Sequence, residues 1–169
     1  MTRLRRVGDG GDVSKEGLCR LLIETTDGGA SVGFLAPMRM EVAERYWDGV
    51  LESIGPGLSL WVVEDAGTIV GSVQLAPSPK ENATHRGEVQ KLFVLPAWRG
   101  RGIASMLMRE LESFARASGR TLLVLDTEAD SAAEAIYRHL GWTFYGGVPE
   151  FAENPHGGLR ANACYYKSL

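Results

Sequence analysis

The sequence predicts a single α/β domain, residues 1–169, in which four helices flank a central, twisted mixed sheet of about seven strands. Two observations lead to this fold class. Some segments are short and apolar, with the period-2 alternation that is typical of strands. They are interspersed along the chain with longer segments in which apolar residues recur at helical spacing. The length of 169 residues also suits one domain that can bury a core of its own.

The first half of the chain is expected to contain one strand, two helices and a hairpin. Leu18, Leu21 and Leu22 lie on one side of the first helix, and a Gly-Pro-Gly segment at 55–57 stops the second. An Asp-Ala-Gly turn at 65–67 marks the hairpin. The predicted bounds are 4–7 for the strand, 13–24 and 38–53 for the helices, and 58–63 and 68–75 for the hairpin strands.

A strand, a short turn and a helix follow one another in the second half. Val89, Lys91 and Phe93 alternate with their neighbours, and Pro96 ends the strand because proline has no N–H to donate. The run TLLVLD at 121–126 is almost continuously apolar, which is typical of a strand covered on both faces. The predicted strands are 88–95, 121–126, 143–146 and 161–167, and the predicted helices are 101–118 and 130–140.

Composition and charge restrict the class of protein. The net charge is −3, which disfavours nucleic-acid binding because that function needs a basic chain or patch. Cys19 and Cys164 stand apart and form no CxxC or Cys/His cluster, which indicates a reducing compartment and no structural zinc. Neither a signal peptide nor an apolar run of membrane-spanning length is recognisable. We therefore expect a cytoplasmic protein, a monomer or homodimer, that does not associate with membranes.

A loop with two glycines and two arginines precedes the helix predicted at 101–118. The start of a helix exposes unpaired backbone N–H groups and carries partial positive charge, so it favours phosphate. Glycine lets the backbone approach a phosphate closely, and arginine adds charge. The spacing R-x-x-G-x-A therefore predicts a phosphorylated cofactor, although a plain surface turn also fits the glycines alone. The predicted contacts are Arg99, Gly100, Arg101, Gly102, Ile103, Ala104 and Ser105.

The loop lacks the Lys-Ser or Lys-Thr of a Walker loop and the third glycine of a dinucleotide fingerprint. Instead, LPAWRGRGIA resembles the loop of the GNAT acyltransferase superfamily, whose amides hold the pyrophosphate of acetyl-coenzyme A (acetyl-CoA). A second GNAT motif, usually N-x-x-A-x-x-x-Y-x-x-x-G-F, follows in the expected order as Asp130, Ala133, Tyr137, Gly141 and Trp142. The resemblance implies a GNAT fold and acetyl-CoA as co-substrate, with Ala133 and Tyr137 among its contacts. Asp130 replaces the asparagine that usually bonds the pantetheine arm, and Ser131 could take over that contact.

Acyl transfer from a thioester needs a base for the acceptor, a donor to the oxyanion and an acid for the departing thiolate. The resemblance assigns the acid to Tyr137, although a tyrosine on an apolar helix face is otherwise a packing residue. It also implies that the strand holding Leu92, Phe93 and Val94 splays from its neighbour and offers backbone groups to pantetheine and the oxyanion. Periodicity alone predicts a fully paired central strand instead.

Two carboxylates are candidates for the base. Glu88 matches a position used as base in some GNAT histone acetyltransferases, and it could instead bind the ammonium of the acceptor. Asp126 ends an apolar strand, where burial can raise the pKa of a carboxyl group. A water relay is a third possibility, and either carboxylate can be an ordinary strand-end residue. The reaction requires no metal.

Five segments, GGASVGF, EVQKL, LDTEA, AEAIY and ACYYKSL, resemble the tabtoxin-resistance acetyltransferases, which inactivate a β-lactam phytotoxin. This resemblance implies acetylation of an amine or hydroxyl on a small molecule such as tabtoxinine-β-lactam, next to Ser31, Val32 and Phe34. A non-catalytic acyl-CoA sensor and a protein or peptide N-acetyltransferase are the alternatives. The three histidines are expected on the surface: His85, His139 and His156.

Overall fold

The computed structural model describes residues 1–8 and 12–169, and a seven-stranded sheet forms its centre. The strand order is β1-β2-β3-β4-β5-β9-β6, in which β4 and β5 are parallel and the other neighbours antiparallel. This confirms the predicted mixed sheet. The strands are β1 (Thr2–Arg6), β2 (Ser59–Asp65), β3 (Thr68–Pro77), β4 (Arg86–Val94), β5 (Leu122–Glu128), β6 (Thr143–Gly146) and β9 (Asn162–Ser168).

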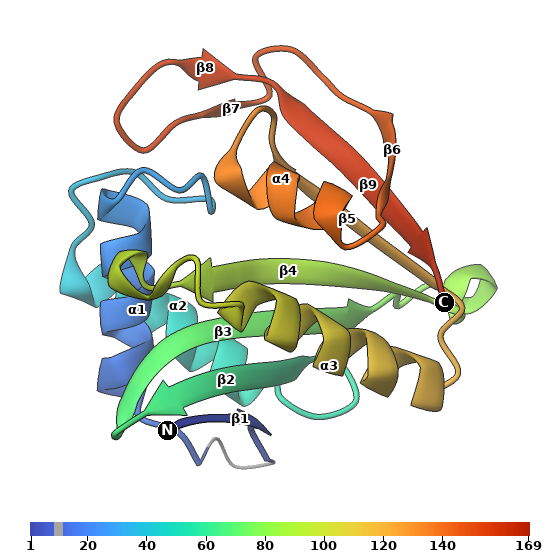
Figure 1. The fold of residues 1–169 in the computed structure, drawn as a ribbon, viewed down its shortest axis with the longest axis horizontal. Helices are drawn as coiled ribbons and strands as arrows, with labels where there is room; N and C mark the ends of the chain where they lie inside the picture. Colours follow the sequence, from blue (N-terminus) through green and yellow to red (C-terminus); the bar gives the residue numbers. More distant parts are fainter. Residues whose placement is uncertain (9–11) are drawn as a thin grey trace.

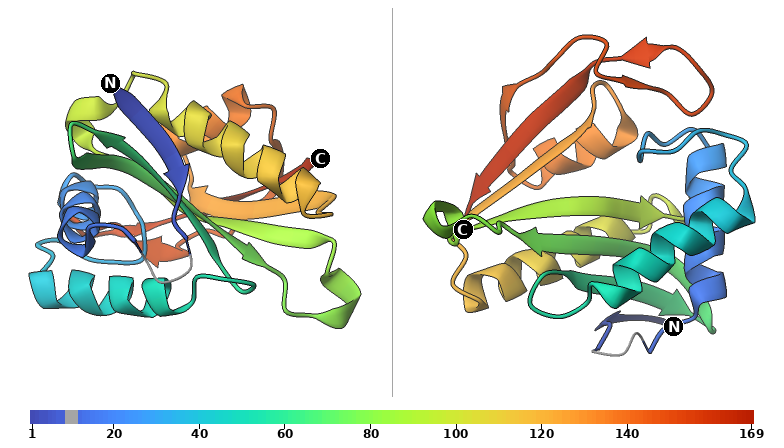
Figure 2. Two further views of the ribbon diagram at one scale, coloured as in Figure 1. Left: turned by 90° about the horizontal axis from the view of Figure 1, so that it is seen from below. Right: turned by 180° about the vertical axis from the view of Figure 1, so that it is seen from behind.

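The four α-helices of the described residues cover both faces of this sheet, as predicted (Figure 1). Helices α1 and α2 pack together on one face, and α3 lies across the other face against β2, β3 and β4 (Figure 2). Helix α4 contacts β5 on the same side as α3. The helices are α1 (Lys15–Asp27), α2 (Met40–Glu52), α3 (Ile103–Ala117) and α4 (Ala132–His139), with short 3-10 turns at η1 (Glu81–Ala83) and η2 (Pro96–Trp98).

Large aromatic side chains fix the helices to both faces of the sheet. Trp47 of α2 is fully buried and meets Phe93 of β4 edge-on, with ring centroids 6.3 Å apart. On the other face, the ring of Trp61 in β2 lies 5.2 Å from that of Phe114 in α3. Aromatic pairs in this geometry add to the free energy gained from burial. The loops that follow these elements therefore start from a rigid frame.

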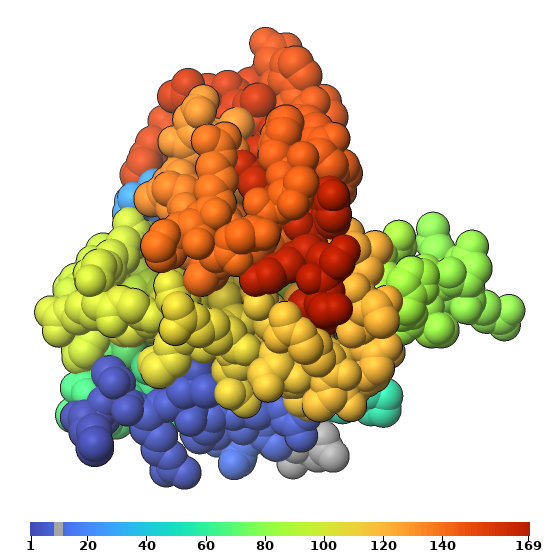
Figure 3. All heavy atoms as spheres, turned by 45° about the vertical axis from the view of Figure 1, so that its right-hand side comes forward, coloured from blue at the N-terminus to red at the C-terminus, as the bar shows by residue number. Residues whose placement is uncertain are grey.

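The sheet opens between β4 and β5. These strands pair over only three residues each, from Arg86 opposite Leu122 to Glu88 opposite Val124. Beyond Glu88 they diverge, while β5 stays paired with β9 (Figure 1). The space-filling view shows the orange and red C-terminal part of the chain standing above the yellow and gold residues of α3 (Figure 3). The implied splay is thus present, and the fully paired strand predicted from periodicity is wrong.

A β-bulge in β4 changes which residues face each side of the sheet. Lys91 and Leu92 both lie opposite one residue of β3, Val73, and Lys91 has a φ of +54°. Because the bulge adds one residue, Val89 and Phe93 lie on opposite faces, whereas simple alternation places them on the same face. Lys91 therefore does not follow the regular alternation of side chains between the two faces of the sheet.

Two parts of the second half differ from the predictions. Strand β5 is not covered on both faces, because Leu123 and Leu125 are buried but Asp126 is exposed where the sheet opens. A small hairpin of β7 (Ala152–Glu153) and β8 (Leu159–Arg160) was not predicted, since the turn-rich sequence there has no apolar alternation. This hairpin lies beside the loop between α1 and α2 (Figure 1).

Candidate active site

A cavity of about 940 Å³ lies where β4 and β5 separate. Its wall combines the loop between α1 and α2, strand β4, the loop before α3, strand β5 with the start of α4, and the C-terminal hairpin. Cavities of this size with several converging polar groups are the usual ligand sites of proteins. The predicted site residues that line it are Ser31, Val32, Glu88, Leu92, Val94, Arg99, Gly100, Gly102, Ile103, Ala104, Ser105, Asp126, Ser131, Ala133 and Tyr137.

Four predicted site residues are absent from this wall: Phe34, Phe93, Arg101 and Asp130. Phe93 is fully buried against α2, because the bulge in β4 reverses its face. Arg101 lies over the tryptophan ring of η2, 4.6 Å from its centroid. Phe34 packs edge-on against Tyr46 of α2, with centroids 5.3 Å apart. These packing contacts hold the Phe34 and Arg101 side chains away from the cavity where they were expected, whereas Phe93 was expected to contribute only its backbone.

The N-terminus of α3 opens into the cavity without a side-chain cap. Gly102 is the N-cap residue, with a φ of +77°, and its carbonyl accepts a hydrogen bond from Met106 at 2.9 Å. The N–H groups of residues 103–105 precede that bond, so they have no partner within the helix. A β-carbon placed on Gly100 or Gly102 would meet no protein atom within 4 Å. The backbone is therefore open to close approach by a phosphate.

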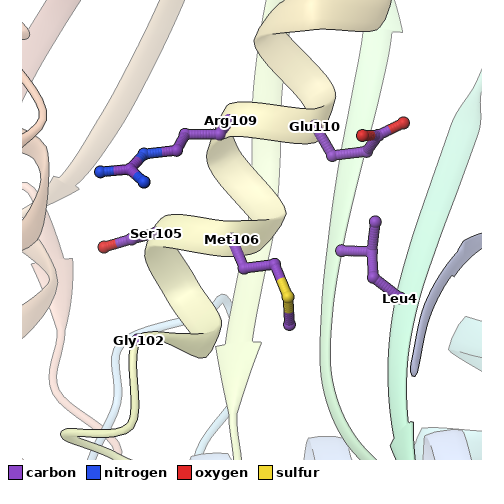
Figure 4. A pocket seen from close by; sticks show the side chains of 6 residues that line it. All are labelled: Leu4, Gly102, Ser105, Met106, Arg109 and Glu110. Carbon is purple, nitrogen blue, oxygen red and sulfur yellow. The ribbon is translucent and has the colours of Figure 1, made fainter. Parts of the chain in front are cut away.

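A second hollow, of about 610 Å³, lies along the first two turns of α3. Ser105 and Arg109 project from one side of the helix, one turn apart, while Met106 and Glu110 project toward Leu4 of β1 (Figure 4). Ser105 lines both hollows. Arg109 thus adds positive charge next to the helix start.

Helix α4 holds Tyr137 in the cavity wall. The side chain is 6% exposed, and its ring lies 6.0 Å from that of Trp142 and 6.5 Å from that of Tyr165. Burial raises the pKa of Tyr137 well above its usual value, and the negative charge of Asp126 raises it further. The hydroxyl group therefore keeps its proton throughout the neutral range, as a general acid must.

A buried carboxylate fixes the start of α4. Glu134 is 3% exposed and accepts hydrogen bonds from the Tyr165 hydroxyl at 2.5 Å, the Asp130 N–H at 2.6 Å and the Arg138 guanidinium at 2.7 Å. Ser131 caps the helix by accepting from the Glu134 N–H at 3.2 Å. Asp130 takes a left-handed φ of +59° in this turn and is exposed. Ser131, and not Asp130, therefore lines the cavity.

We expect Glu134→Gln to lower the free energy of unfolding by about 1–3 kcal/mol, because buried donors lose a charged acceptor. Burial raises the pKa of Glu134, but hydrogen bonds from Tyr165, Asp130 and Arg138 lower it more. The carboxylate thus stabilises the fold above its unfolded pKa, and this contribution is lost as the pH falls through the folded pKa. Urea denaturation at neutral and acidic pH measures both effects.

Glu24→Gln provides the matched control for this experiment. Glu24 accepts from Arg20 at 2.9 Å in a pair of the same helical spacing, but both side chains are about half exposed. Removing this exposed ion pair should lower the free energy of unfolding by only about 0.5 kcal/mol or less. Equal losses for the two variants would contradict the structural role given to Glu134.

Glu88 and Asp126 line the cavity from β4 and β5, and both are exposed. Asp126 accepts a long hydrogen bond from the Asn162 amide at 3.4 Å. Asn162 is itself 6% exposed and accepts from the N–H of Val148 at 2.7 Å. The burial expected of Asp126 is wrong, because alternation in β5 places Leu125 inside and Asp126 on the open side.

Lys91 is a cavity residue that the sequence reasoning missed. Its half-buried ammonium donates to the Val32 carbonyl at 2.5 Å and lies 5.7 Å from the ring centroid of Phe34. Burial lowers the pKa of Lys91, and the charges of Asp126 and Glu88 act in the opposite direction. A lysine within a largely apolar strand, directly before Leu92, was the available signal.

The β7–β8 hairpin and the α1–α2 loop contact each other at one side of the cavity, in a contact that we call the clasp. Asn154 donates to the Glu128 carboxylate at 3.0 Å and to the Gly29 carbonyl at 3.4 Å. The His156 Nε2 lies 2.8 Å from the carbonyl oxygen of Asp27. His156 is exposed as predicted, but this contact gives it a structural role that the sequence did not indicate.

Cys19 and Cys164 are free thiols. Among residues 1–8 and 12–169, no group of three or more His, Cys, Asp or Glu side chains is arranged to hold a metal ion. In the same part of the chain, no helix is both long and apolar enough to cross a membrane.

Residues 30–142 match the acetyltransferase (GNAT) family. The matched region contains most of the cavity wall, from the loop before α2 to Tyr137 of α4. The chain belongs to the GNAT acetyltransferase family. The predicted GNAT fold is thereby confirmed, and the predicted use of acetyl-CoA, the co-substrate of that family, agrees with the family assignment.

Individual GNAT relatives agree with this assignment. An uncharacterized N-acetyltransferase from the hisH-hisA intergenic region of Azospirillum brasilense is 37% identical over 111 residues, 64% of this chain and 65% of the relative. The uncharacterized N-acetyltransferase YjgM of Escherichia coli is 35% identical over 115 residues, 67% of this chain and 68% of the relative. The chain thus spans about two thirds of the length of these curated relatives. Both relatives are named N-acetyltransferases, which agrees with the predicted class of enzyme.

A solved structure matches the whole GNAT chain. YncA from Salmonella typhimurium, whose structure contains its cofactor acetyl-CoA, has a TM-score of 0.79 and 16% identity to this chain. The match covers 100% of this chain and 94% of YncA. At this level of identity the likeness shows the shared fold.

Proposed function

We propose that this GNAT protein transfers the acetyl group of acetyl-CoA to the amine of a small molecule in the cavity between β4 and β5. One observation carries the proposal: the same cavity is lined by an uncapped helix start, by Tyr137 and by two carboxylates. A non-catalytic sensor would need only the first of these features. The acid and the candidate bases favour a catalyst.

The residues of the cavity suit the cofactor. The N–H groups of residues 103–105 and the side chain of Arg99 would hold its phosphates, and the conformations of Gly100 and Gly102 leave the approach open. When bound, acetyl-CoA supplies an acetyl group activated as a thioester. Leu92 and Val94 have no β5 partner, so their backbone groups are available to polarise a carbonyl.

Proton transfer is assigned to side chains of the cavity wall that come from β4, β5 and α4. Asp126 or Glu88 accepts the proton that the acceptor amine loses, and we favour Asp126 because Asn162 orients its carboxylate. Tyr137 keeps its proton on the phenolic oxygen and can donate it to the departing group. A water relay is the alternative to a direct base.

We expect Asp126→Asn to lower kcat by about 10²-fold or more and to flatten the acid limb of the pH–rate profile, because an amide cannot accept the proton. Glu88→Gln makes the same change on the other strand. If Glu88 only binds the acceptor's ammonium, this variant should mainly raise KM. Thiol release measured across about pH 5–9 separates the two roles. If both variants keep the rate and the acid limb of the parent, neither carboxylate is the base.

The resemblance to tabtoxin-resistance acetyltransferases makes tabtoxinine-β-lactam one acceptor to test. Support for it comes from sequence segments alone, among them GGASVGF at 28–34 and LDTEA at 125–129. Thiol release from acetyl-CoA should be screened with this compound, small amines, amino acids and a peptide with a free N-terminus. Turnover of a small amine supports the proposal. Binding of acetyl-CoA without turnover of any acceptor would identify a sensor, and turnover of the peptide alone would identify a peptide N-acetyltransferase.

A further inference from the structure

The ammonium group of Lys91 is a positive charge in the cavity wall without a carboxylate partner. Among the ion pairs of the described residues, none involves Lys91. One of its three N–H donors bonds the Val32 carbonyl at 2.5 Å, and the ammonium also lies 5.7 Å and 5.9 Å from the ring centroids of Phe34 and Tyr46. Its other two N–H donors have no hydrogen-bond partner among the described residues, so they remain for a ligand. A half-buried charge costs free energy unless it is paired or hydrogen-bonded. The site is therefore suited to an anionic group.

Backbone geometry sets the position of this ammonium. The bulge in β4 gives Lys91 its φ of +54°, a conformation that is uncommon for residues other than glycine. On the other side, a β-carbon at Gly33 would lie 3.2 Å from the Lys91 Nζ atom, so the glycine leaves room for it. The loop and the bulge together hold the lysine beneath residues 31–33. Strained backbone of this kind is often found at functional sites.

Negative charge lies elsewhere in the same cavity. Glu88 and Asp126 are exposed and line it, and neither forms an ion pair with Lys91 among those of the described residues. One cavity thus presents a cation and two anions that do not neutralise one another by direct contact. A ligand that satisfies both needs an amine for the carboxylates and a carboxylate for the lysine.

We propose that Lys91 binds the carboxylate of an amino-acid-like acceptor and so directs the acceptor's amine toward Asp126 and Glu88. This inference rests on the proposed acetyl transfer and specifies its substrate class. Lys91 is then a specificity-determining residue. Amines without a carboxylate fit the cavity but lack the contact that distinguishes the preferred acceptor.

The test compares each common L-amino acid with its own carboxamide, which keeps the amine and the size but removes the negative charge. The parent should prefer the amino acid in kcat/KM. Lys91→Met keeps an unbranched side chain of nearly the same length without the charge and should reduce this preference about 10- to 100-fold. Lys91→Arg should retain most of it. Lys80→Met changes an exposed lysine outside the cavity, so it should leave the preference as it is in the parent.

A binding measurement separates this inference from the proposed reaction. Calorimetry in the presence of CoA, which has no acetyl group to transfer, should show that Lys91→Met weakens amino-acid binding by a similar factor. A parent without preference for the carboxylate would overturn the proposal. The proposal would also be overturned if Lys91→Met lost the same affinity for an amino acid and for its carboxamide. Lys91 would then only anchor the loop. If the parent turns over no acceptor, the reaction fails, and the calorimetric preference still decides the role of Lys91.

Discussion

Tyr137→Phe is expected to lower kcat by about 10²- to 10⁴-fold, the usual effect of losing a general acid. The variant keeps the ring and its packing against Trp142 and Tyr165, and removes only the hydroxyl group. The affinity for acetyl-CoA should change little, because binding is assigned mainly to the α3 loop. Thiol release at saturating substrates measures the first effect, and calorimetry measures the second.

Tyr166→Phe is the control for this variant. Tyr166 lies on β9, is 36% exposed and does not line the cavity. The Tyr166→Phe variant should therefore keep the parent's rate. If Tyr137→Phe also turns over at nearly the parent's rate, Tyr137 is a packing residue and another group protonates the leaving thiolate. A rate loss accompanied by a lower melting temperature would point to disturbed packing instead.

The second large effect is expected for Gly102→Val, which should weaken acetyl-CoA binding about 10- to 100-fold. A β-branched side chain would occupy the open space beside the helix start, where the phosphates need close approach. The expected loss corresponds to one hydrogen bond to a charged group, about 1.5–3 kcal/mol. Calorimetric titration with acetyl-CoA measures it directly.

Gly119→Val controls for backbone strain. Gly119 follows the other end of α3 and has a φ of +78°, against +77° at Gly102, and a β-carbon added there would likewise meet no atom within 4 Å. Both variants should lose stability through the left-handed conformation, by about 1–2 kcal/mol. Only Gly102→Val should lose cofactor affinity. Unchanged affinity in that variant would refute the assignment of the loop.

The elements that follow strong local patterns were predictable from the sequence. Helix α3 was predicted at 101–118 and spans Ile103–Ala117, and its start is delayed because Gly102 adopts a left-handed conformation. The β7–β8 hairpin was not predictable, because distant partners hold it, such as Glu128 and Asp27 in the clasp. No pattern within residues 147–160 contains that information.

The site was predictable where its geometry is local. The loop before α3 and Tyr137 belong to motifs whose spacing fixes their positions on a helix. The face of the sheet on which Lys91 lies was not predictable, because one additional residue in β4 reverses the alternation of side chains. Trp142 stood out as a departure from the usual phenylalanine, and the structure gives a reason: its indole N–H donates to the buried Glu112 at 3.1 Å.

The opening between β4 and β5 also affects how the protein avoids self-association. Unpaired strand edges invite other chains to add a strand, and proteins commonly protect them by keeping outer strands short. Here the outer strands β1 and β6 have only five and four residues. The longer unpaired stretches, beyond Glu88 on β4 and Val124 on β5, lie in the middle of the sheet and face each other. The backbone groups that a ligand can use are thus placed where a strand from a neighbouring molecule has the least access, which favours a binding site without an aggregation-prone edge.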